Sequence, residues 1–188
     1  MGSPCTIVEA LKFAQSECET ALSEFLGTEV AFTPEECAER QADELLTVVG
    51  QFVRMDEVSR AIVVGVYGDL QGYLVMLLSP NDAERLAAYM LDGDSDPEMQ
   101  ESVLAEIGNL TTARLLMGIS KGFRLNGEAL PTPPTTQVDF SGALLQSLTV
   151  LLLSQGQTKV MHSVWKLQVQ LPDGAACGTA HFFLPLQG

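Results

Sequence analysis

The order of the secondary-structure signals in this chain repeats once, and this repetition limits the folds that the chain can adopt. The first set is helix 7–26, strand 28–33, Pro34 and hairpin 58–78, and the second is helix 96–118, strand 123–130, loop 131–134 and hairpin 160–186. Such a repeat predicts one domain, 1–188, made of two similar halves, about 1–94 and 95–188. The expected fold class is α/β (α+β), a pseudo-twofold duplicated unit with a mixed, largely antiparallel sheet and long helices packed on it.

Capping and turn residues mark the stronger elements. Ser95 and Glu98 form a capping-box pattern that begins helix 96–118. Ser79 and Pro80 are typical of an N-cap and a first helical position, so they predict a helix that follows the first hairpin.

Other segments give weaker signals. The acidic stretch 35–44 is expected to be a loop or a short helix, and 45–55 is ambiguous between helix and strand, with strand favoured. A short helix is predicted over 139–146. The apolar run 148–154 is predicted to be a buried strand.

Composition restricts the partners. The net charge is −14, and residues 1–112 hold 21 acidic and 5 basic side chains. The basic footprint needed for non-specific nucleic-acid binding is missing, and an anionic membrane is disfavoured for the same reason. The four cysteines are scattered without a CxxC pair, no apolar run reaches the roughly 20 residues of a membrane span, and no signal peptide is visible. These features predict a cytoplasmic protein that binds neither nucleic acid nor membrane.

One face of helix 96–118 carries a narrow polar stripe. At about 100° per residue, Ser102, Glu106, Asn109 and Ala113 fall within about 60° of one another. The neighbouring Gly108 and Asn109 both have low helix propensity. Their presence in mid-helix favours a functional explanation, and Gly108 is expected to let another backbone, such as a partner's, approach closely.

Several enzyme templates do not fit the chain. It has no GxSxG, P-loop or GxGxxG pattern. Its two histidines, His162 and His181, lie on predicted strands and are expected to face solvent or a partner. An acid–base histidine network is therefore not predicted.

The spacing Ser102-x3-Glu106-x2-Asn109, with a proline-rich loop a little over twenty residues later, resembles the signature of the CheC/CheX/FliY family of bacterial chemotaxis phosphatases. Segments 25–30 and 65–93 also resemble that family. The resemblance implies a CheC/CheX-like fold and dephosphorylation of the aspartyl-phosphate of a CheY-like response regulator.

Two details refine the resemblance. The first helix has no Glu-x2-Asn pattern, so a single site is expected, as in CheX. The family has a proline 23 residues after the asparagine, where this chain has Thr132 between Pro131 and Pro133.

The resemblance also implies roles for individual residues. Glu106 would pair with a lysine in the active site of the response regulator's receiver domain. Asn109 would orient the water that attacks the aspartyl-phosphate. Ser102, Ala113 and Pro133 are expected to contact the partner. No cofactor or metal is expected in this chain, because Mg²⁺ would be held by the partner receiver domain.

Two alternatives remain open. The same fold occurs without the catalytic pair in the flagellar switch protein FliM, so the chain could be a non-catalytic scaffold that binds a response regulator. The protein could also form a homodimer through its C-terminal strands, as CheX does.

Overall fold

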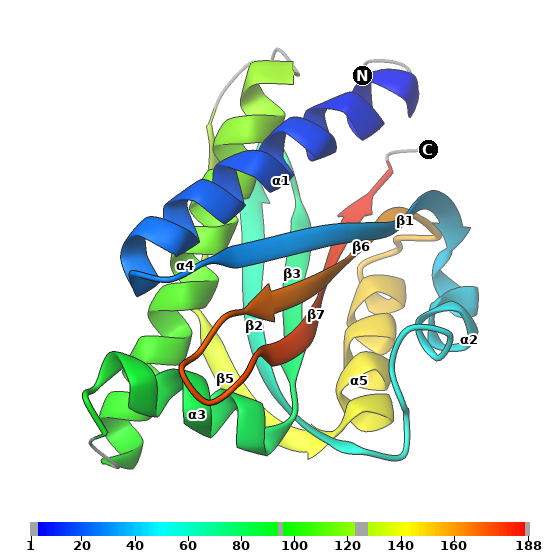
Figure 1. Ribbon diagram of the computed structural model, residues 1–188. Coiled ribbons are helices and arrows are strands. Elements are labelled where there is room, and N and C mark those ends of the chain that lie inside the picture. Colours follow the sequence, from blue (N-terminus) through cyan, green and yellow to red (C-terminus); the bar gives the residue numbers. More distant parts are fainter. Residues whose placement is uncertain (1–3, 94–95, 123–127, 187–188) are drawn as a thin grey trace.

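The computed structural model describes residues 4–93, 96–122 and 128–186, and these form one sheet with helices on both faces (Figure 1). The helices are α1 (Pro4–Leu26), α2 (Leu45–Val49), α3 (Pro80–Met90), α4 (Pro97–Gly122) and α5 (Ser141–Ser154), with a 3-10 turn η1 (Ala42–Glu44). The strands are β1 (Val30–Gln41), β2 (Val58–Gly68), β3 (Gly72–Leu78), β4 (Ala129–Pro131), β5 (Thr135–Phe140), β6 (Lys159–Val169) and β7 (Ala176–Pro185).

The sheet has the order β1-β6-β7-β3-β2-β4, and β5 also pairs with β2. β4 and β5 therefore bind successive parts of the outer edge of β2. The expected α+β class is confirmed, and all the strand pairs among the described residues are antiparallel. None of the described helices is long and apolar enough to cross a membrane.

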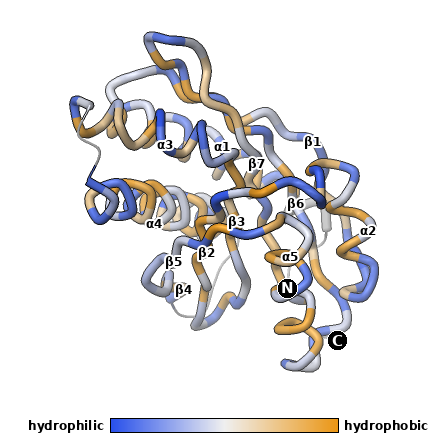
Figure 2. Tube along the Cα trace, turned by 90° about the horizontal axis from the view of Figure 1, so that it is seen from below, coloured by the Kyte–Doolittle hydropathy of each residue, from blue (hydrophilic) through white to orange (hydrophobic). Residues whose placement is uncertain are grey.

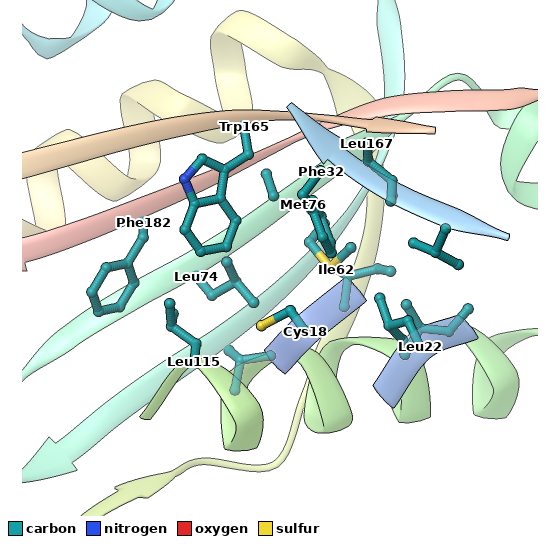
Figure 3. Close-up of a cluster of buried hydrophobic side chains, with 14 of the residues drawn as sticks. Cys18, Leu22, Phe32, Ile62, Leu74, Met76, Leu115, Trp165, Leu167 and Phe182 are labelled. Carbon is teal, nitrogen blue, oxygen red and sulfur yellow. The ribbon is translucent and has the colours of Figure 1, made fainter. Parts of the chain in front are cut away.

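The first core lies between the sheet and the pair of helices α1 and α4 (Figure 1). Leu22 of α1 and Leu115 of α4 belong to this core, together with Trp165 and other strand residues (Figure 3). The two helices approach closely at Gly118, where an added Cβ would lie 2.4 Å from the Cα of Ala14. This crossing fixes α4 over the sheet, with one face of the helix left outward.

The opposite face of the sheet carries a second, smaller core under α2 and α5. Leu145, Leu148 and Leu152 of α5 are buried there with Val75 and Phe183 of the central strands. Figure 2 shows α4 and α5 on different sides of β2 and β3. The sheet is thus covered on both faces, but by helices of different length.

The cap predicted for α3 is confirmed. Ser79 caps α3 by accepting the backbone N–H of Asp82 at 3.0 Å. At the start of α4, Asp96 Oδ1 accepts the N–H of Glu98 at 2.9 Å. Ser95, the predicted cap of α4, lies outside the described residues.

The first strand is longer than predicted. β1 continues through Pro34 to Gln41, so the expectation of a loop or short helix over 35–44 was largely wrong. The register against β6 shifts between Pro34 and Glu36, which accommodates the proline as a bulge. β1 pairs only with β6 among the described strands, and an edge strand tolerates the missing N–H of a proline.

Two apolar segments are helical where strands were expected. Leu45–Val49 forms α2, and 148–154 is the second half of α5, which also begins later than the helix predicted over 139–146. Short apolar runs do not distinguish a buried strand from a buried helix by periodicity. Contact with the sheet determines that this segment is a helix, because Leu145, Leu148 and Leu152 recur at helical spacing on the buried side.

The predicted strand 123–130 can be compared only in part, because 123–127 lie outside the described residues. Its described end contributes to β4, which runs from Ala129 to Pro131. β5 was not predicted: its first residues belong to a polar stretch after three prolines, and it is held in place by β2.

Both histidines were wrongly expected to face solvent or a partner. His162 and His181 are fully buried on neighbouring strands, and the ring of Phe183 stacks on His162 with centroids 4.7 Å apart. The alternation of buried and exposed residues in β6 begins only after Trp165. Before it, the strand is covered on both faces.

Each half of the chain pairs its first strands with the hairpin of the other half. β1 pairs with β6, the first strand of the second hairpin, while β4 and β5 pair with β2, the first strand of the first hairpin. The hairpins meet where β3 pairs with β7. We retain the division into two similar halves, 1–94 and 95–188, as a proposal.

Candidate functional site

The predicted polar stripe lies beside the proline-rich loop. An open groove of about 480 Å³ lies between α4 and the β4–β5 connection. It is lined by Ser102, Ala105, Glu106, Asn109, Pro131, Thr132, Pro133 and Pro134. Residues separated by more than twenty positions in the sequence therefore form one surface.

The back of α4 explains how the stripe faces outward. Gly108 is buried, and an added Cβ would lie 2.5 Å from Cγ2 of Ile62 and 3.3 Å from Cγ2 of Val64. The glycine thus allows α4 to pack against β2. The expectation that it admits a partner's backbone was wrong, and the low helix propensity at this position has a packing cause. Asn109, the next residue, is turned toward the groove.

The opposite wall of the groove is fastened to β2 by Thr132. Its backbone N–H donates to the carbonyl oxygen of Gly65 at 2.8 Å, and the N–H of Gly65 donates to Thr132 Oγ1 at 2.9 Å. An added Cβ on Gly65 would lie 3.1 Å from Cγ2 of Thr132. These contacts set the position of Pro131 and Pro133 relative to α4.

Two polar side chains of the groove, Glu106 and Asn109, form no polar interaction with other described residues. Neither the exposed Glu106 carboxylate nor the half-buried Asn109 amide has a hydrogen-bond or ion-pair partner there. A carboxylate can receive a cation, and an amide can both accept and donate a hydrogen bond without titrating. The pair is therefore free to interact with a molecule placed in the groove.

The other predicted contact residues differ in their placement. Ser102 lines the groove, but its Oγ donates to the carbonyl oxygen of Glu98 at 3.0 Å. Pro133 lines the opposite wall. Ala113 is half-buried one turn beyond Asn109 and is not among the residues that line the groove. Their contacts with a partner remain a prediction.

A second polar cluster lies on the opposite face of the sheet. His162 Nε2 is 3.2 Å from His181 Nδ1, and His181 Nε2 is 2.9 Å from Thr179 Oγ1. Burial lowers the pKa of His162 to about 4, with a further lowering by the charge of Arg40. Burial also lowers the pKa of His181, to about 3. Both rings are therefore neutral near pH 7, and neither lines the groove on α4.

Sequence reasoning missed this histidine pair, because its members look like ordinary strand residues. The available signal was the run of apolar residues on both sides of His162 and His181, which indicates strands buried on two faces. Within the described ranges, no group of three or more His, Cys, Asp or Glu side chains is arranged to hold a metal ion.

Comparison with known proteins gives structural matches only. No family model and no curated protein matches the chain. FliY from Thermotoga maritima superposes with a TM-score of 0.67 and 16% identity, over 98% of this chain and 92% of that chain. The CheX-CheY-BeF3-Mg²⁺ complex from Borrelia burgdorferi gives 0.57 and 16%, over 96% and 98%.

The FliM middle domain from H. pylori is also similar, with a TM-score of 0.57 and 9% identity over 98% of this chain and 94% of that chain. Identities this low establish the fold alone. The chain therefore has the fold of CheX, FliY, CheC-like proteins and the FliM middle domain, as its sequence resemblance predicted.

Proposed function

We propose that this protein dephosphorylates the aspartyl-phosphate of a CheY-like response regulator. The observation that carries the proposal is the groove, in which Glu106 and Asn109 stand side by side without partners among the described residues. The fold supports it, because one of the similar structures is a CheX in complex with CheY and BeF3.

In this mechanism Asn109 positions the water. Its side-chain oxygen accepts a hydrogen bond from the water, and its NH₂ group donates to a phosphoryl oxygen. The water oxygen attacks phosphorus in line, the bond from phosphorus to the receiver's aspartate breaks, and the carboxylate leaves. The water's proton passes to the released phosphate, so the amide itself is not protonated. Phosphoryl transfer depends mainly on such positioning and on charge neutralisation.

Glu106 sets the orientation of the two proteins. Its exposed carboxylate can form an ion pair with a lysine of the receiver, one turn along α4 from the amide. No metal is required from this chain in the proposal, because Mg²⁺ would be bound by the receiver and would neutralise the phosphoryl charge.

The test is release of phosphate from a phosphorylated CheY-like receiver. Asn109→Ala should reduce the accelerated release by roughly 100-fold or more, as removal of one positioned transition-state contact does. Gln146→Ala removes an exposed amide from α5, which covers the opposite face of the sheet, and should leave the rate unchanged. Unchanged release by Asn109→Ala would contradict the proposal.

The second candidate is a scaffold that binds a receiver without hydrolysing its phosphate. The similarity to the FliM middle domain favours it, because that match and the match to the CheX complex have the same TM-score of 0.57. A scaffold would bind the receiver and leave the lifetime of its phosphate unchanged. The same release assay, run with and without the protein, separates the two candidates.

We also propose a cytoplasmic location for this reaction. Cys18, Cys37 and Cys177 are all free thiols in the structure. Free thiols of this number are typical of a reducing compartment.

A further inference from the structure

The groove beside α4 continues into an exposed apolar surface on β5. The direction of the side chains on β2 establishes this. Ile62 and Val64 point at Gly108 of α4, so the even-numbered residues of β2 face that helix. Arg60 agrees, because its Nη1 lies 3.7 Å from Oε1 of Glu101 on α4.

The strand pairing transfers this direction to β5. Val138 lies opposite Arg60, Phe140 opposite Val58, and Thr136 opposite Ile62. Residues directly opposite each other in an antiparallel pair share a face. Val138 and Phe140 therefore lie on the sheet face that α4 covers, yet they are 52% and 53% exposed.

α4 thus leaves the outermost strip of this face uncovered. Val58 is also exposed, and we call Val58, Val138 and Phe140 the apolar shelf. β5 lies at the edge of the sheet beside α4 (Figure 2). From Pro134 in the groove to Phe140 on the shelf, an extended strand spans about 20 Å. A partner seated in the groove can therefore reach the shelf.

The two edges of the sheet differ in this respect. β1 has Pro34, a bulge, and an ion pair between Glu36 and Arg40, features that protect an edge strand from unwanted contacts. β5 instead presents two large exposed apolar side chains. Exposed apolar side chains next to a groove can add contact area for a molecule that binds there.

We propose that the apolar shelf is part of the docking surface for the phosphorylated receiver, an inference that rests on the proposed function. Continuity with the groove supports this occupant, because β5 begins directly after Pro134, which lines the groove. The chain carries −14, and an aspartyl-phosphate site is itself acidic, so long-range electrostatics oppose association. Burial of apolar area beside the groove supplies affinity that the charges do not.

The test is binding to a CheY-like receiver held in its active form with BeF3⁻ and Mg²⁺. The double variant Val138→Ser/Phe140→Ser should weaken binding by roughly tenfold or more, and raise KM similarly, because it removes two apolar contacts. The turnover number kcat should stay unchanged, because neither residue touches the groove. Phe140 is the N-cap of α5, a position where serine is favourable, so the fold should persist. Thermal melting checks this.

The matched control is Val150→Ser/Leu153→Ser, which removes two comparably exposed apolar side chains from α5 on the opposite face. It should bind the receiver normally. Equal weakening by both double variants, or none by the shelf variant, would overturn the proposal. So would a shelf variant that binds the receiver normally but sediments as a smaller species, because the shelf would then join two copies of this chain.

Salt gives an independent readout. Binding that depends on the shelf should strengthen slightly or stay constant as salt is added, and a steep loss would contradict it. The outcomes also separate this inference from the proposed function. If Asn109→Ala abolishes phosphate release while the shelf variant binds normally, only the shelf is wrong. If the wild-type chain binds the receiver through the shelf without releasing phosphate, only the catalytic assignment is wrong.

Discussion

A pair of polar side chains is accessible on one side of the sheet, and another pair is buried on the other side. On the α4 face, Glu106 and Asn109 are accessible and have no partner among the described residues. On the other face, His162 and His181 are fully buried and lie within hydrogen-bond distance of each other. The histidines have the shifted pKa values, but of these two sites only the groove is open to a substrate.

A perturbed pKa therefore does not by itself locate the reactive groups of this protein. Here burial is the first cause of both shifts, and burial also excludes a partner protein. We therefore expect changes to the groove side chains Glu106 and Asn109 to alter phosphate release at constant stability. Changes at the histidine pair should alter stability at constant phosphate release.

The largest effect is expected for charge reversal in the groove. Glu106→Lys would place a cation against the receiver's lysine, and like charges brought together at an interface cost several kcal/mol. We expect kcat/KM for phosphate release to fall roughly a thousandfold, about 4 kcal/mol. The melting temperature should hardly change, because the Glu106 carboxylate has no partner to lose among the described residues.

Glu84→Lys is the control for this variant. Glu84 is exposed on α3 and does not line the groove, and the change shifts the net charge by the same amount, from −14 to −12. If Glu84→Lys loses as much activity as Glu106→Lys, the effect comes from total charge and not from the groove.

The second prediction concerns stability at low pH. Burial lowers the pKa of His162 to about 4 from its ordinary value of 6.5, so between pH 6.5 and 4 the unfolded chain binds a proton that the folded chain does not. Its contribution to stability is therefore fully present above pH 6.5 and is lost as the pH falls toward 4. The loss is on the order of 3 kcal/mol and is measured by urea unfolding at several pH values.

His162→Phe should reduce that pH dependence, because the ring stacking with Phe183 can be kept without a titrating group. The variant should release phosphate at the wild-type rate. A large loss of activity in a folded His162→Phe protein would break the contrast between the two faces.

Local signals in the sequence were sufficient for the elements whose ends are fixed by short-range contacts. Ser79 capping α3 and the stripe on α4 are of this kind, since a cap and a helical spacing depend on residues a few positions apart. The groove was predicted only in part: the resemblance placed a proline-rich loop near Asn109, but nothing local shows that Thr132 binds Gly65.

The errors have a common physical cause. Whether 148–154 is a helix, whether β1 passes Pro34, and whether His162 is buried all depend on which sheet face is covered and by what. These are long-range facts. The role of Gly108 was wrongly predicted for the same reason. A glycine is needed there because the side chain of Ile62, 46 positions away in the chain, packs against it.

A third, smaller effect is expected at that glycine. In Gly108→Ala the new Cβ would lie 2.5 Å from Cγ2 of Ile62, so either α4 or the Ile62 side chain must shift. Overpacking of this kind costs about 2 kcal/mol, partly offset by the better helix propensity of alanine. Urea unfolding measures the loss. Combining the change with Ile62→Ala should give less than the sum of the two single losses, because the second variant removes the clashing methyl.

The smallest effect is expected at Thr132, where the α4 face uses a polar partner to position a loop. Thr132→Val keeps the shape and the backbone N–H bond to Gly65 but removes the hydroxyl that accepts the N–H of Gly65. A net hydrogen bond is worth about 1 kcal/mol, so KM for the phosphorylated receiver should rise a fewfold as Pro131 and Pro133 become less fixed. Thr132→Ser retains the hydroxyl and should restore most of the affinity. If Thr132→Val lowers the free energy of unfolding by as much as it weakens receiver binding, Thr132 stabilises the fold and does not specifically position the groove. The distinction between an exposed face that positions a partner and a buried face that stabilises the protein would then not hold at this residue.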